Sequence, residues 1–245
     1  MIRKFDFLII GSGVAGMSYA LKVARAGKGK VAIVCKTTLD EANTAKAQGG
    51  IASVTNLELD NFEKHIQDTM IAGDFISDPE AVEQVVRNAP QGIKDLVKWG
   101  VNFDKTDTGE FDLHREGGHS EFRILHHADD TGFEIQRGLM EAVRREPNIT
   151  ILENHFAVEV ITQHHLGIEV TRRTPDIECY GAYILDPDTN KIDTFLSKVT
   201  LMATGGTGAV YATTTNPNIA TGDGIAMVYR AKGTVQGMEF VQFHP

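Results

Sequence analysis

Three glycines near the start of the chain have the spacing of a dinucleotide-binding loop. Between an apolar segment (residues 5–10) and a stretch of helical periodicity (residues 14–26) stand Gly11, Ser12, Gly13, Val14, Ala15 and Gly16. In a G-x-G-x-x-G loop, the first glycine permits a tight turn, the second admits a pyrophosphate, and the third lets helix and strand pack. The helix N-terminus then offers N–H groups to the anion. A structural glycine turn is the alternative, and the strand–helix context favours the nucleotide.

The end of the next apolar segment lacks the acidic residue that usually accompanies such a loop. About 20 residues beyond the glycines, an Asp or Glu normally binds the adenosine ribose, but Lys36 stands there. A lysine cannot accept a hydrogen bond from a ribose hydroxyl. Two interpretations stay open. Either Lys36 holds a phosphate while a backbone group binds the ribose, or it is an ordinary surface lysine.

Further segments rich in small residues could approach a flat ring or a phosphate. They are residues 43–52 (NTAKAQGGIA), 203–206 (ATGG) and 221–224 (TGDG). Small side chains permit close backbone approach, although a flexible surface loop has the same composition. Residues 113–120 (LHREGGHS) add charge to a glycine pair. Taken alone, Arg115 and Glu116 there would be interpreted as an exposed ion pair of little energetic value.

The histidines invite a metal interpretation that their spacing does not support. Six of the nine stand at positions 114, 119, 126, 127, 164 and 165. These spacings match no zinc template, and no cysteine lies nearby in the sequence. We therefore expect no metal site. His164 and His165 are expected in a turn, and His119 is either a pocket residue or a hydrogen-bonding residue of its loop.

Composition limits the classes of protein that remain. The chain has 245 residues, a net charge of -9, 42% hydrophobic and 23% charged residues, which is ordinary globular composition. The negative charge disfavours nucleic acid. Cys35 and Cys179 form no C-x-x-C pair, so a disulfide-stapled fold or a dithiol enzyme is not expected. No apolar run approaches the roughly 18 residues that span a bilayer, and no signal-peptide cleavage site is recognisable. We expect a cytoplasmic protein without membrane or nucleic-acid partners.

The elements that must position these residues alternate between strand and helix at the start. Residues 5–10, 14–26 and 31–35 predict a βαβ unit and hence a parallel sheet. Further helices are predicted over residues 60–71, 78–99 (interrupted near Pro90), 131–145 and 222–232, and strands over 149–153, 156–162, 167–171, 177–185, 193–195 and 198–203. Residues 37–61 and 102–120 are expected to be irregular. The fold class is α/β: a Rossmann-like domain with a parallel sheet, a helical insertion and a β meander. The sequence stops at Pro245 directly after an apolar segment, and we expect an incomplete polypeptide, a natural end being the alternative.

Together, the glycine loop, the A-Q-G-G segment, the two later glycine segments and the R-E-G-G-H-S segment resemble the flavoprotein family of succinate dehydrogenase, fumarate reductase and L-aspartate oxidase. The resemblance covers essentially the whole chain and about the N-terminal half of a family member. Dehydrogenases and membrane fumarate reductases bond FAD covalently through a histidine five residues before the Gln of A-Q-G-G. Asn43 stands at that position, which implies noncovalent FAD. Residues 115–120 resemble L-aspartate oxidase, because dehydrogenases carry a glutamine-bearing variant there.

The resemblance implies a division of the chain and a set of cofactor contacts. An FAD-binding domain would span residues 1–236, with a helical insertion over about 60–145 and a β meander over about 149–197, and residues 237–245 would begin a capping domain. The residues implied in FAD binding are Gly11, Ser12, Gly13, Val14, Ala15, Gly16, Lys36, Asn43, Thr44, Ala45, Lys46, Ala47, Gln48, Gly49, Gly50, Phe156, Ala157, Thr204, Gly205 and Asp223.

The implied reaction is FAD-dependent oxidation of L-aspartate to iminoaspartate, the first step of NAD synthesis from aspartate. Oxygen or fumarate would accept the electrons, and the product would pass to quinolinate synthase. By resemblance, Glu116 lies beside the substrate amine, His244 contacts a substrate carboxylate, and Gln242 lines the same pocket. The catalytic arginine would lie beyond residue 245, so this chain alone would be inactive. Alternatives are a soluble fumarate reductase or succinate dehydrogenase relative, and a non-catalytic FAD-binding fragment.

Overall fold

The computed structural model describes residues 1–242 and separates the chain into two compact units. The first unit joins residues 1–43 to the chain from residue 143 on, and the second contains residues 44–142. Elements of the first unit are β1 (Ile2–Ile10), α1 (Val14–Arg25), β2 (Val31–Val34), β6 (Ile149–Leu152), β7 (Phe156–Thr162), η1 (Gln163–Leu166), β8 (Cys179–Asp186), β9 (Lys191–Met202), η2 (Gly208–Val210) and α6 (Asp223–Arg230). The second unit holds β3 (Ile51–Ala52), α3 (Phe62–Ala72), α4 (Pro79–Lys98), β4 (Leu113–His114) and β5 (Ile124–Leu125). The boundaries fall within α2 (Asn43–Lys46) and α5 (Thr131–Arg145).

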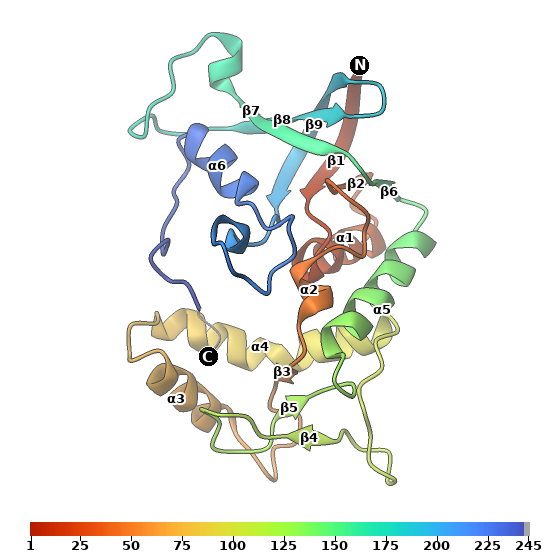
Figure 1. Cartoon of the computed structure of the whole chain (residues 1–245), viewed down its shortest axis with the longest axis vertical. Helices are drawn as coiled ribbons and strands as arrows, with labels where there is room; N and C mark the ends of the chain where they lie inside the picture. Colours follow the sequence, from red (N-terminus) through yellow and green to blue (C-terminus); the bar gives the residue numbers. More distant parts are fainter. Residues whose placement is uncertain (243–245) are drawn as a thin grey trace. The chain divides into compact units, whose positions relative to one another are not determined.

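The first unit is built on a six-stranded sheet with the order β6-β2-β1-β9-β8-β7 (Figure 1). β6, β2, β1 and β9 run parallel, and β9 continues into an antiparallel meander with β8 and β7. All four residues of β2 are buried, as expected where a parallel sheet is covered on both faces. The expected class, an α/β fold with a parallel sheet and a β meander, is confirmed.

The order of the strands reverses at β1, because β2 lies on one side of β1 and β9 lies on the other. The Gly11 amide donates to the Val34 carbonyl at 2.9 Å, and the Ala203 amide donates to the Ile10 carbonyl at 2.8 Å. The segments that follow β1, β2 and β9 therefore leave the same edge of the sheet. Open α/β sheets bind their ligands at the carboxyl ends of the strands, where the strand order reverses.

Two predictions about secondary structure are wrong, each for a physical reason. The helix over residues 79–98 is not interrupted at Pro90. Its buried face, formed by Val86, Ile93 and Leu96, continues across the proline, so apolar packing on both sides outweighs the loss of one backbone hydrogen bond. The strand predicted over residues 167–171 is absent, because η1 ends at Leu166, its C-cap Gly167 has φ +81°, and the chain then enters turns.

Other elements differ from the prediction in their extent. The strands predicted over residues 193–195 and 198–203 are one strand, β9, because β1 pairs along one side of it and β8 along the other. The sequence predicts an irregular segment over residues 37–61, but the structure has α2 and β3 there. The helix over residues 131–145 has the predicted bounds.

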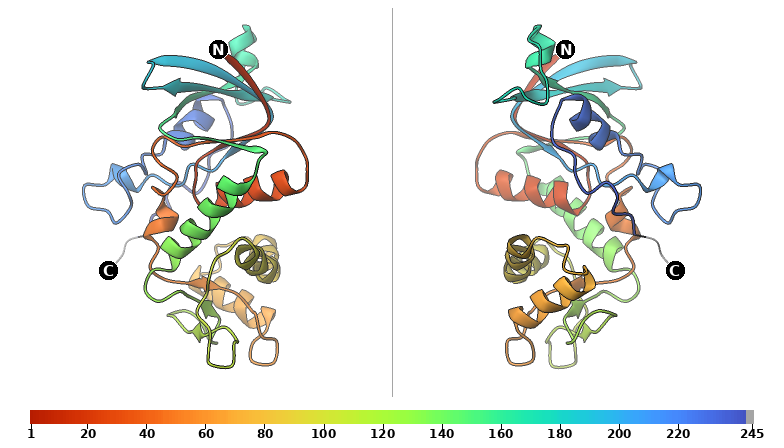
Figure 2. Two further views of the ribbon diagram at one scale, coloured as in Figure 1. Left: turned by 90° about the vertical axis from the view of Figure 1, so that its right-hand side faces the viewer. Right: turned by 90° about the vertical axis from the view of Figure 1, so that its left-hand side faces the viewer.

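The second unit contains the helices α3 and α4 and a small antiparallel sheet with the order β3-β5-β4. In Figure 2, α4 is seen nearly end-on, and α3 lies below it and runs across the view. The Asn61 side chain caps α3 by accepting from the Lys64 amide, and Asp78 caps α4 by accepting from the Glu80 and Ala81 amides; such caps satisfy donors that the helix leaves unpaired. Within residues 1–242, no helix combines the length and the apolar character needed to cross a membrane.

Candidate functional site

The glycine loop joins β1 to α1 as the sequence predicts. The structural reason for a glycine differs from one position of the loop to the next. Gly11 has φ +115°, and a Cβ there would lie 2.1 Å from the Ala203 carbonyl oxygen. A Cβ at Gly16 would lie 2.2 Å from the Gly11 carbonyl oxygen. Both positions therefore require glycine for the chain to pack. Gly13, the N-cap of α1, has φ −73° and ψ −179°, a conformation open to any residue.

The N-terminus of α1 is suited to an anion. No acidic residue lies in its first turn, and no side chain caps it among the described residues. The helix dipole and the first-turn N–H groups favour negative charge at such an end. Because backbone geometry does not demand glycine at position 13, the absence of a side chain there keeps space in front of the helix. The loop therefore fits the pyrophosphate of a dinucleotide.

Lys36 has a partner that its position in the sequence does not reveal. Its Nζ donates to Asp223 Oδ2 at 2.5 Å and to Thr221 Oγ1 at 2.6 Å, and Thr221 Oγ1 donates to Asp223 Oδ2 at 2.8 Å. The two charged side chains are 25% and 31% exposed, so both keep a face to solvent. The pairing brings a carboxylate to the end of β2, where the usual fingerprint has one.

Other predicted cofactor residues of the first unit surround the same strand ends. Gly205 has φ +69°, and a Cβ there would lie 3.5 Å from Asn43 Nδ2. Gly224 packs so closely on Thr204 that a Cβ would lie 1.9 Å from Thr204 Oγ1. The T-G-D-G and A-T-G-G segments are therefore in contact.

Phe156 and Ala157 begin β7 directly after a connection to the segment following β2. The His155 amide donates to the Cys35 carbonyl at 2.9 Å, and the Asn154 amide donates to the Thr37 carbonyl at 2.9 Å. Phe156 is half-buried, and the Ala157 side chain belongs to the core of the sheet. The Ala157 side chain is therefore not available to a ligand.

In the second unit, the A-Q-G-G segment and the R-E-G-G-H-S loop lie together. A Cβ at Gly49 would lie 3.4 Å from Glu116 Oε1, and one at Gly50 would lie 2.3 Å from the Leu125 carbonyl oxygen. Thr44 and Ala45 are half-buried, whereas Lys46, Ala47, Gln48, Gly49 and Gly50 are exposed. The Glu116 carboxylate thus stands against the segment in which the sequence predicts cofactor contacts.

Two predicted substrate residues lie near the end of the chain. Gln242 is exposed. His244 lies outside the described residues, so its predicted role remains a prediction.

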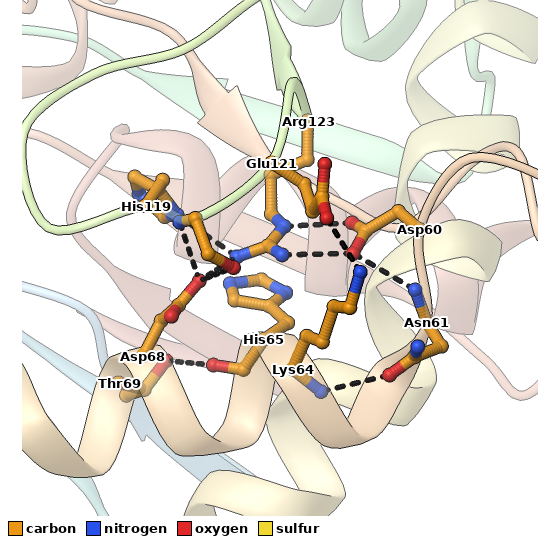
Figure 3. Close-up of polar contacts among 10 residues, drawn as sticks. Asp60, Asn61, Lys64, His65, Asp68, Thr69, His119, Glu121 and Arg123 are labelled. Carbon is orange, nitrogen blue, oxygen red and sulfur yellow. Dashed lines mark hydrogen bonds and ion pairs between the residues drawn. The ribbon is translucent and has the colours of Figure 1, made fainter.

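A buried arginine anchors the loop that carries Glu116 (Figure 3). Arg123, immediately before β5, is fully buried and forms a two-pronged ion pair with Asp60, at 2.7 Å from Nε and 2.8 Å from Nη2. Its Nη1 donates to Asp68 Oδ2 at 2.5 Å. That same oxygen accepts from the amide and the hydroxyl of Ser120, both at 2.8 Å. Arg123 and Asp68 thereby fasten the end of the R-E-G-G-H-S loop to α3.

Burial and ion pairing oppose one another in this cluster, and pairing decides the charge state. Burial alone would raise the pKa of Asp60 and of Asp68. Hydrogen bonds outweigh that effect, so the pKa values of both carboxyl groups lie below the ordinary value. Arg123 donates to both groups, the Asn61 amide donates to Asp60, and Ser120 donates to Asp68. Burial, with Arg123 nearby, lowers the pKa of His65. The cluster therefore holds one cation, two carboxylates and a neutral His65.

The contact with Arg123 also fixes the state of His119. Arg123 Nη1 lies 3.3 Å from His119 Nδ1, and an arginine can only donate. His119 Nδ1 therefore accepts this hydrogen bond. Of the two interpretations left open by the sequence, the hydrogen-bonding one is observed. The sequence does not predict the cluster itself, because no local pattern links Asp60 and Asp68 with Arg123.

We expect Arg123→Met to destabilise the second unit strongly, because it leaves Asp60 buried without its cation. Removing one member of a buried ion pair costs about 3–5 kcal/mol. Urea unfolding followed by the fluorescence of Trp99, the single tryptophan, which is 8% exposed in this unit, measures the effect. Arg87→Met is the matched control, since Arg87 pairs with Glu63 and Glu83 on the surface. Equal losses in both variants would show that burial of the Arg123 pair contributes nothing.

Comparison with known proteins identifies the class. The FAD binding domain family matches residues 6–245. The chain belongs to this family of flavoproteins, and its cofactor is FAD.

Individual relatives narrow the likeness further. The chain is 46% identical to the chloroplastic L-aspartate oxidase 2-b of Nicotiana tabacum over 99% of its length and 36% of that protein. It is 44% identical to the L-aspartate oxidase of Acinetobacter baylyi, covering 99% of the chain and 43% of that protein. A solved quinol fumarate reductase of E. coli has a TM-score of 0.84 at 28% identity, with 94% of this chain and 37% of the other covered. The chain therefore spans less than half the length of these relatives. The resemblance to the succinate dehydrogenase and L-aspartate oxidase flavoproteins that its motifs indicate is confirmed.

Proposed function

We propose that this chain is the FAD-binding part of an L-aspartate oxidase that converts L-aspartate to iminoaspartate. FAD, when bound, supplies the acceptor for the hydride that leaves the substrate α-carbon. The observation that carries the choice of substrate is the placement of the Glu116 carboxylate against Gly49 in the A-Q-G-G segment. A carboxylate there attracts an α-ammonium group, which aspartate has and succinate lacks.

The identity to L-aspartate oxidases supports this proposal. In the proposed enzyme, different residues of the chain bind the cofactor and the substrate. The glycine loop and the α1 N-terminus bind the pyrophosphate, and Asp223, oriented by Lys36, accepts a hydrogen bond from the ribose. Glu116 orients the amine, while Gln242 and His244 contribute to the carboxylate side of the pocket. We place residues 1–236 in the FAD-binding domain and residues 237–245 at the start of the capping domain.

The electron acceptor is oxygen or fumarate, and the likeness to a fumarate reductase supports fumarate. In this account the enzyme works in the cytoplasm and its product passes to quinolinate synthase. The central test compares L-aspartate with succinate as reductant of the bound flavin.

We expect the flavin to be held without a covalent bond, because Asn43 stands where related dehydrogenases have the linking histidine. The side-chain amide nitrogen of an asparagine is not nucleophilic enough to form a bond to the methyl carbon of the flavin. Acid precipitation of purified protein should therefore release all FAD into the supernatant, as absorbance of both fractions would show. Yellow colour in the washed pellet would contradict the expectation.

A further inference from the structure

A second cluster of chemically capable side chains lies in the β4–β5 hairpin and involves none of the predicted FAD contacts. Asp112, His114 and His126 each place a ligand atom within 4.8 Å of the others. Leu113 pairs with Leu125 in the antiparallel ladder, so one step along, Asp112 faces His126. Because side chains alternate along a strand, Asp112, His114 and His126 share one face of this hairpin.

His126 at the centre of this cluster is buried and lacks hydrogen bonds. It is 8% exposed, and neither Nδ1 nor Nε2 has a hydrogen-bond partner among residues 1–242. Nε2 lies 3.7 Å from Asp112 Oδ2, and Nδ1 lies 3.3 Å from Asp104 Oδ2. Buried polar nitrogens without partners are rare and need an explanation, and a bound ion is one of the explanations that apply to such groups.

The backbone holds the carboxylates in place. The Asp104 amide donates to the His126 carbonyl at 2.9 Å, and the Asp112 amide donates to the Asp104 carbonyl at 3.0 Å. The Ala128 amide donates to Asp104 Oδ2 at 2.7 Å. Asp104 is therefore fixed beside one nitrogen of His126, while Asp112 stands beside the other.

We propose that Asp112, His114 and His126 bind a divalent transition-metal ion such as zinc. Two imidazoles and one carboxylate form a donor set that suits zinc, and three protein ligands leave a fourth position for water. Asp104 takes the position of the carboxylate that orients a metal-binding histidine through its other nitrogen. The sequence predicts no metal because its spacing matches no template, whereas the hairpin brings the ligands together from two strands.

Binding of the ion requires the stacked rings of His114 and His126 to separate, and the exposed His114 can move. The rings of His114 and His126 are stacked, with centroids 3.7 Å apart and planes at 21°. Zinc–nitrogen bonds of about 2.0 Å need lone pairs that converge on the ion, so one ring must leave the stack. His114 is exposed and Asp112 is 49% exposed, so both can turn toward the fixed His126.

The test is a zinc titration of the untagged, EDTA-treated chain by calorimetry, with Co²⁺ absorption as a second readout. We expect one equivalent of zinc to bind and tetrahedral cobalt bands to form. His114→Asn, at an exposed position that should not disturb folding, should abolish both signals, as should His126→Asn. Asp104→Asn should weaken zinc binding by about 10–100-fold. The control His164→Asn/His165→Asn removes an adjacent histidine pair elsewhere and should change nothing.

Two outcomes overturn the proposal. One is a wild-type chain that binds no zinc. The other is zinc binding that His114→Asn leaves unchanged or that the control variant abolishes, which would locate the ion elsewhere. Thermal unfolding gives an independent measure, because an ion that binds the folded state raises Tm. Zinc should raise Tm of the wild type and of the control, but not of His114→Asn.

Discussion

Glu116→Gln should lower kcat/KM for L-aspartate oxidation by roughly one to three decades while fumarate reduction is kept or improved. The substitution keeps the size and hydrogen-bonding capacity of the side chain and removes its charge. Glu116 is exposed in this chain, so the pair that it forms with the ammonium group is buried only once the substrate is bound. A buried charge pair loses roughly 2–5 kcal/mol when one partner is truncated, and each decade in rate corresponds to about 1.36 kcal/mol. Fumarate carries no ammonium group, so its reduction loses no favourable interaction when the Glu116 charge is removed. The measurement uses the longest natural polypeptide that contains this chain.

The ratio of the two activities is the decisive quantity, because it cancels a general loss of folding. Glu121→Gln is a suitable control, since Glu121 forms an exposed ion pair with Lys64 just after the same loop. That variant should leave the ratio unchanged. If Glu116→Gln lowers both activities by the same factor, the Glu116 carboxylate does not select the amino group.

Gly13→Val should abolish flavin binding while the chain stays folded. With φ −73° and ψ −179° at this position, valine meets no backbone strain. Valine is a clearly poorer N-cap than glycine, but the cost of about 1 kcal/mol should leave the chain folded. Its branched side chain would occupy the space in front of α1 that the phosphates need. The flavin-to-protein absorbance ratio of the purified variant measures binding, and circular dichroism measures the fold.

Gly11→Ala is the comparison that separates loss of flavin binding from loss of stability. At φ +115°, with a Cβ 2.1 Å from the Ala203 carbonyl oxygen, even a methyl group must displace backbone, so this variant should lose thermal stability as well as flavin. A folded Gly13→Val protein with its full flavin content would show that the loop does not hold the cofactor.

The sequence predicts best the features that depend on neighbouring residues. The strand β1, the glycine loop and α1 follow from apolar runs and glycine spacing within the first 26 residues, and α5 has the predicted bounds. Pro90 shows the limit of such local reasoning. A proline usually interrupts a helix, but here the buried face of α4 on both sides of Pro90 decides the outcome.

The site depends on contacts between residues far apart in the sequence, and these could not be predicted. For Lys36 the sequence allows either a phosphate ligand or a surface lysine, and its pairing with Asp223 spans 187 positions. Arg123 meets Asp60 across 63 positions. A motif can identify which residues belong to a family, but the partner of a charged side chain depends on the complete fold.

Anaerobic reduction of the bound flavin tests the central claim most directly. The longest natural polypeptide containing this chain is purified with its FAD, and L-aspartate or succinate is added without oxygen. We expect aspartate to bleach the visible flavin absorbance and succinate at the same concentration to do so far more slowly. Bleaching by succinate in preference to aspartate would contradict the central claim, and so would a fully loaded flavoprotein that neither compound reduces.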